Sequence, residues 1–154
     1  MDKYTGRHAA GAVLACALLA FAGGASAQVV ISQVYGGGGN GGAPYTHDFI
    51  ELHNNGTAAV DLTGWSVQYA SSAGSSWQRT NLSGSIAPGG YFLVQQAQGA
   101  NPGTPLPAPD VVGTLALSAT AGKVALVNNT TTLTGVCPTG NVDFLGFGTT
   151  TTTN

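Results

Sequence analysis

The stretch Phe49-Ile50-Glu51-Leu52-His53, followed by Asn54-Asn55-Gly56, decides the fold class of this chain. A period of two places Ile50 and Leu52 on one face of a β-strand and the other three side chains on the opposite face. The Asn-Gly pair that follows is a turn signal and ends the strand. The stretch therefore predicts a strand whose apolar face packs against another layer.

Short runs of this kind recur along the chain, and turn residues bound each of them. The glycine-rich run at residues 36–42 and the sequence Ala87-Pro88-Gly89-Gly90 cannot continue a regular strand. After residue 27 no stretch repeats apolar residues with the helical period of about 3.6. Strands without intervening helices predict an all-β fold, an antiparallel β-sandwich. The predicted strands are residues 29–35, 49–53, 66–70, 77–82, 91–95, 111–117, 123–127 and 142–147.

Residues 1–27 have the composition of a bacterial secretory signal peptide. Lys3 and Arg7 precede an uncharged apolar run at residues 9–22, and Ala25-Ser26-Ala27 is a small-x-small cleavage site. The apolar run is shorter than the roughly 20 residues that a membrane helix needs. We therefore expect cleavage, export from the cell, one domain at residues 28–154 and no membrane span.

Charge is scarce: only 6% of the residues are charged, against about 25% in an ordinary domain. Arg79 and Lys123 are the only basic residues after residue 27. A protein that binds nucleic acid by electrostatics needs a basic patch for the phosphates. Autonomous nucleic-acid binding is therefore not expected.

Cys137 and the end of the chain both suggest a domain that continues. Cys137 is the one cysteine of residues 28–154, so no disulfide can form within that segment. Residues 149–154 are threonine-rich and add no apolar strand, whereas sandwiches usually protect their open edges. We expect that the domain lacks its last strand and that the chain is a fragment of a longer protein.

Five short motifs, in this order, resemble a bacterial lamin tail domain. The resemblance implies an immunoglobulin-like β-sandwich that has no catalytic residues of its own and serves as a secreted interaction or scaffold module. Its partner would be a protein or a cell surface. Such domains often precede an endonuclease/exonuclease/phosphatase-type domain, so the resemblance also implies an alternative, the N-terminal part of an extracellular nuclease or phosphatase whose catalytic domain lies downstream. The motifs are Val30-Ile31-Ser32-Gln33-Val34-Tyr35, Asp48-Phe49-Ile50-Glu51-Leu52-His53-Asn54, Val60-Asp61-Leu62-Thr63-Gly64-Trp65-Ser66-Val67, Ile86-Ala87-Pro88-Gly89-Gly90-Tyr91-Phe92-Leu93-Val94 and Val142-Asp143-Phe144-Leu145-Gly146-Phe147-Gly148.

The ionisable residues around the first strand quoted above suggest two metal sites. His47 and His53 share a strand face with Glu51, which lies about 6.5–7 Å from His53, so a transition metal is one interpretation and a solvated polar face is the other. Asp48, Glu51 and Asn40 adjoin the carbonyl-rich glycine run, and Ca²⁺ prefers such oxygen ligands. Calcium is the one cofactor that the sequence suggests.

Aromatic residues offer a further candidate site. Trp77, Tyr69 and Tyr45 form an exposed stacking platform for a sugar or a base in one interpretation. In the other, Trp77 packs at the edge of the sandwich, as aromatic residues commonly do. No serine lies in a Gly-x-Ser-x-Gly turn, and Asp48 and Glu51 point to opposite strand faces, so no catalytic residue is predicted.

Overall fold

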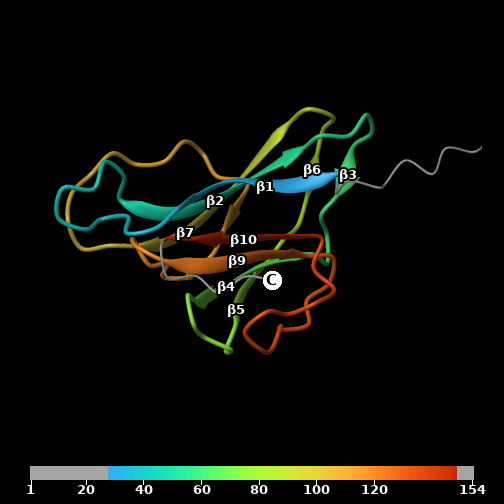
Figure 1. Ribbon diagram of the computed structural model, residues 1–154. Helices are drawn as coiled ribbons and strands as arrows, with labels where there is room; N and C mark the ends of the chain where they lie inside the picture. The colour runs from blue at the N-terminus through green and yellow to red at the C-terminus, as the bar shows by residue number, and fades with distance from the viewer. Residues whose placement is uncertain (1–27, 149–154) are drawn as a thin grey trace, which may run out of the picture.

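Two four-stranded β-sheets pack face to face in the computed structural model of the chain, which describes residues 28–148 (Figure 1). The first sheet has the strand order β1-β2-β7-β8, the second has the order β10-β9-β4-β5, and β3 pairs separately with β6. The predicted signal peptide and residues 149–154 lie outside the described residues. The strands are β1 (Val29–Tyr35), β2 (His47–Asn54), β3 (Val60–Asp61), β4 (Ser66–Ser71), β5 (Gln78–Asn81), β6 (Ser85–Ile86), β7 (Tyr91–Gln98), β8 (Val111–Val112), β9 (Gly122–Val127) and β10 (Asp143–Phe147).

The prediction of an all-β sandwich is confirmed. Alternate residues of β2 and β7 point into the space between the sheets, and alternate residues of β4 and β9 meet them from the other side. Each fully buried aliphatic side chain contributes about 1.5–3 kcal/mol of transfer free energy. The core side chains that these four strands contribute are Ile50, Leu52, Val67, Tyr69, Phe92, Val94, Val124 and Leu126.

One pair of strands departs from the predicted antiparallel pattern. β8 runs parallel to β7, with Val94 opposite Val111. A parallel pair needs a connection of about a dozen residues, and residues 99–110 supply it without a helix. We call these residues the crossover. The absence of helices was therefore not sufficient to exclude a parallel pair, because a long irregular segment can serve where a helix usually does.

The strand predicted at residues 111–117 is shorter than expected. Strand β8 ends at Val112, and the chain then passes close to the other sheet at Gly113. A Cβ atom at that position would collide with the side chains of Thr80 and Gln96, so only glycine fits there. Leu115 follows in the core, and its backbone N–H donates to Gln96 Oε1 over 3.0 Å.

The sandwich is closed on one side by a contact between strands of the two sheets. β1 has an irregular register between Ile31 and Gln33. There the backbone N–H of Ile31 donates to Asp143 Oδ2 of β10 over 2.7 Å. An edge N–H of the first sheet is thus satisfied by a side chain of the second. Residues 28–148 include no helix with the length and apolar character to cross a bilayer.

Candidate interaction groove

The carboxylate of Asp48 lies on the core side of β2 and accepts hydrogen bonds from two distant segments. Its Oδ1 accepts from the backbone N–H of Gly38 over 2.6 Å, and its Oδ2 accepts from that of Leu117 over 2.7 Å. Burial raises the pKa of Asp48 above its ordinary value of 3.8, because desolvation outweighs the backbone donors that lower it. Asp48 therefore ties the glycine-rich loop to the segment after β8.

The predicted calcium ligands do not come together. Asp48 is buried with both oxygens facing N–H donors, whereas Glu51 lies on the outer face of the sheet and accepts from Ser32 Oγ over 2.7 Å. Asn40 is exposed in the glycine-rich loop and shares with Asp48 a hollow of about 300 Å³. Glu51 lies apart from Asp48 because strand residues at odd spacing point to opposite faces. Across residues 28–148 no group of three or more His, Cys, Asp or Glu side chains is arranged to hold a metal ion.

The two histidines lie near opposite ends of β2 and have separate contacts. The Nδ1 atom of His47 is hydrogen-bonded to Thr46 Oγ1 over 2.8 Å. The ring of His53 stacks on Tyr91 with their centroids 4.4 Å apart. Six residues of extended strand separate the two histidines by about 20 Å. The predicted transition-metal site at His47 and His53 is therefore not formed.

The predicted aromatic platform does not form either, because its three residues lie in three different places. Tyr69 packs between the sheets, where its hydroxyl accepts from the backbone N–H of Ser118 over 3.0 Å. Trp77 is 5% exposed on the outer side of the second sheet, and its Nε1 donates to the carbonyl of Gly135 over 2.9 Å. Tyr45 lies over the outer face of the first sheet. The packing interpretation of Trp77 is thus the correct one.

An irregular segment covers the outer face of the second sheet. We call residues 128–141 the cover segment. Gln68 of β4 donates from Nε2 to the carbonyl of Thr131 over 2.8 Å and accepts at Oε1 from the backbone N–H of Leu133 over 2.9 Å. Ser66 also donates to this segment. An irregular segment needs such partners for the backbone groups that it turns toward a sheet, because these groups have no ladder to join.

Lys123 is the cation beneath the cover segment. Its side chain is 0% exposed, and its Nζ donates to the carbonyls of Gly74 over 2.7 Å and Val136 over 2.8 Å. The Nζ atom also lies 5.7 Å from the ring centroid of Trp77. A buried ammonium needs such partners to offset the loss of water. Lys123 and Trp77 therefore join the cover segment to the sheet.

The outer face of the first sheet carries an aromatic cluster instead. Tyr35 of β1 stacks on Phe49 of β2 with centroids 5.2 Å apart and planes at 14°. Tyr45 meets Phe49 edge-on at 6.0 Å. Phe49 is only 7% exposed although it points away from the core. These rings form a rigid floor beside the crossover.

A groove of about 320 Å³ runs between this face and the crossover. We call it the aromatic groove. Its polar lining comes from Gln33, Glu51 and Asp110. Tyr91 lies at the rim of the groove and is 63% exposed. One face of its ring stacks on the ring of His53. The apolar lining consists of Tyr45, Phe49, Leu93, Leu106, Pro107, Ala108 and the ring of Tyr91.

Sequence reasoning missed most of this groove. The alternation in β7 already places Tyr91 and Leu93 on the face opposite Phe92 and Val94, which is the outer face of the sheet. Two apolar side chains on an otherwise polar face were the available signal. The contribution of Leu106 and Pro107 could not be predicted from the sequence, because it depends on where the crossover lies.

The sequence profile of the Lamin Tail Domain family matches residues 23–143, more than half of the chain. This chain belongs to the lamin tail domain family. Membership agrees with the immunoglobulin-like β-sandwich described above and with an interaction domain rather than a catalytic one. No curated protein matches the chain.

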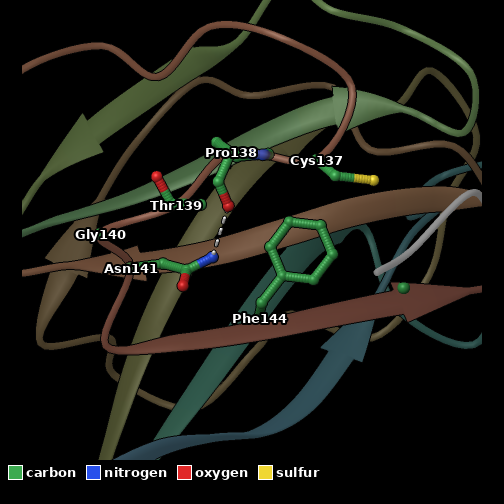
Figure 2. Close-up of a pocket in the computed structure, with 7 residues that line it drawn as sticks. Cys137, Pro138, Thr139, Gly140, Asn141 and Phe144 are labelled. Atoms are coloured by element: carbon green, nitrogen blue, oxygen red, sulfur yellow. Dashed lines mark hydrogen bonds between the residues drawn. The ribbon is translucent and has the colours of Figure 1, made fainter.

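This lamin tail domain has a second, larger hollow beside the cover segment, of about 500 Å³ (Figure 2). The ring of Phe144 extends from β10 toward Cys137 and Pro138, and Asn141 Nδ2 donates to the Pro138 carbonyl over 3.4 Å. Its lining has no charged side chain and a single large apolar ring. The aromatic groove, with three aromatic rings, four aliphatic side chains and two carboxylates, is the better binding surface.

Proposed function

We propose that this lamin tail domain is a secreted, non-catalytic interaction module that holds a partner protein in the aromatic groove. The observation that carries the proposal is the exposed ring of Tyr91 above an apolar floor formed by Phe49 and Leu93. Tyrosine is enriched at protein interfaces because it buries a large area at a small cost in conformational entropy. The cover segment leaves the second sheet with no comparable surface.

Tyr91→Ala is expected to weaken partner binding about tenfold or more, because buried interface tyrosines often act as hot spots. The free energy of unfolding should change by less than about 0.5 kcal/mol, as for other exposed side chains. Val112→Ala is the matched control, since Val112 is 64% exposed on the same sheet but does not line the groove. The two variants and the parent chain are immobilised, and the protein that each retains from native culture fluid is quantified. Equal retention by all three would refute the proposal.

Export is supported by the position of the first strand. β1 begins at Val29, and the side chain of Gln28 donates to the carbonyl of Ala58 over 2.9 Å. Cleavage after Ala27 would leave the strand and this contact intact. N-terminal sequencing of the native product from the medium should give Gln28 as the first residue. A product that starts at Met1, or that stays inside the cell, would contradict export.

A role as the N-terminal part of an extracellular nuclease or phosphatase is the alternative, supported by the resemblance to domains that precede such enzymes. In that case the partner held by the groove would belong to the same polypeptide. A denaturing blot of the native product with an antibody against residues 28–148 separates the two. A band several times larger than the module supports the alternative, and a band at the size of the module removes it.

A further inference from the structure

We propose that the aromatic groove binds an extended peptide that carries arginine or lysine beside apolar residues. This inference rests on the proposed function and names the chemistry of the partner. Both charged side chains that line the groove are acidic, namely Glu51 of β2 and Asp110 at the end of the crossover. Glu51 is partly exposed and Asp110 is exposed, so both can reach a ligand.

Neither of the two arginine and lysine side chains within residues 28–148 lines the groove. Arg79 belongs to β5 of the other sheet, where its guanidinium contacts Thr132 of the cover segment. Lys123 is buried beneath the cover segment. The groove therefore presents two acidic side chains with no arginine or lysine in its lining, and a cationic ligand is the complement of that charge.

The carboxylates are also held in place by the fold. Glu51 Oε1 accepts from Ser32 Oγ over 2.7 Å, and Asp110 Oδ2 accepts from the backbone N–H of Leu93 over 2.7 Å. A carboxylate has a second oxygen for a ligand, and pre-positioned acceptors lower the entropy lost on binding. The rings of Tyr45 and Tyr91 add faces that attract a guanidinium or an ammonium group.

Neutral sugar chains are the competing ligand class, since aromatic rings beside polar groups also suit them. Neutral sugars gain no electrostatic attraction from the two carboxylates, whereas a basic peptide is attracted by both. An extended peptide also suits the shape of the groove. One irregular segment, the crossover, already lies along this sheet face and contributes Leu106 and Pro107 to the lining. The observations therefore favour a basic peptide.

The test is an NMR titration of the ¹⁵N-labelled chain with an acetylated, amidated hexapeptide of alternating leucine and arginine. The control peptide has citrulline, the neutral isostere, in place of arginine. We expect the arginine peptide to bind at least about fivefold more tightly and to shift the amide signals of Tyr91, Leu93 and Ala108. The difference should shrink as salt is raised.

Glu51→Gln and Asp110→Asn remove one charge each and keep the acceptor oxygen that holds the side chain. Each is expected to reduce the preference for arginine, and the double variant should abolish it. Asp61→Asn is the matched control, because Asp61 is an exposed carboxylate on β3, outside the groove. Its preference for the arginine peptide should equal that of the parent chain.

Three results would overturn the inference. Equal binding of the two peptides would show that the carboxylates do not select a basic ligand. Binding of neither peptide would show that the groove is not a peptide site. Groove shifts with cellohexaose in place of the peptides would identify a sugar-binding groove. A failed peptide titration in which Tyr91→Ala still abolishes retention of the native partner would leave the proposed function standing. Failure of both measurements would remove both.

Discussion

Replacing Trp77 by alanine is expected to lower the free energy of unfolding by about 3–5 kcal/mol, the usual cost of deleting a buried aromatic side chain. Trp77 is 5% exposed, packs against Phe144 of β10 with centroids 5.9 Å apart, and lies beside the Nζ atom of Lys123. Urea unfolding monitored by circular dichroism measures the loss. A change below about 0.5 kcal/mol would indicate an exposed tryptophan and would contradict the packing described here.

Trp77→Phe is the matched control for the same site. It keeps an aromatic ring but loses the Nε1–H donor that binds the carbonyl of Gly135. We expect a smaller loss, about 1–3 kcal/mol, for the unsatisfied carbonyl and the lost ring area. Hydrogen exchange should also quicken in the cover segment, since Gly135 lies within it.

Asp48→Ala is the second substitution with a large expected effect. It leaves the backbone N–H groups of Gly38 and Leu117 without their acceptor, and each buried unsatisfied donor costs about 1–3 kcal/mol. We therefore expect a loss of about 2–6 kcal/mol in urea unfolding. Glu51→Ala on the same strand but the outer face should cost less than about 1 kcal/mol, because its partner Ser32 is exposed. Similar losses in the free energy of unfolding for the two variants would contradict the role of Asp48 in joining the glycine-rich loop to the segment after β8.

The cost of Asp48→Ala should depend on pH in a defined direction. Because burial raises the pKa of Asp48 above 3.8 in the folded state, the folded protein holds this proton more tightly than the unfolded chain does. The stabilisation that Asp48 contributes through this proton is complete below pH 3.8, and it is lost as the pH rises through the pKa of the folded state. The difference between parent and variant should therefore shrink from acid to neutral pH. A difference that grows over this range would contradict the raised pKa.

Calcium gives an independent check on Asp48. Because both of its oxygens accept backbone N–H groups, we expect millimolar Ca²⁺ or a chelator to leave the melting temperature of the parent chain unchanged. A ligand that binds only the folded state would raise it. A chelator-induced fall that Ca²⁺ reverses would restore the calcium site suggested by the sequence.

Local pattern was sufficient to predict the layers of this fold. The alternation around Ile50 and Leu52 correctly places them in the core, and the run at residues 29–35 coincides with β1. Turn residues then set the strand boundaries, because glycine and proline limit where a strand can continue. Such information is contained in neighbouring residues and needs no knowledge of the rest of the chain.

The surfaces could not be predicted in the same way. Gln68 and Lys123 alternate with apolar residues and therefore indicate a solvated face, yet both are buried because the cover segment lies over them. Trp77 is buried for the same reason. The aromatic groove likewise needs the crossover to bring Leu106 beside Phe49, residues separated by half of the domain. Contacts between irregular segments and sheet faces are set by the whole fold.

The first sheet presents the open face of this domain, and the second sheet presents a covered one. Photo-crosslinking in the organism that makes the protein distinguishes the two faces, with benzoylphenylalanine placed either at Tyr91 in the groove or at Val136 on the cover segment. Both positions are exposed, at 63% and 37%. We expect a crosslinked partner from Tyr91 and none from Val136. A partner captured at Val136 and absent at Tyr91 would contradict it.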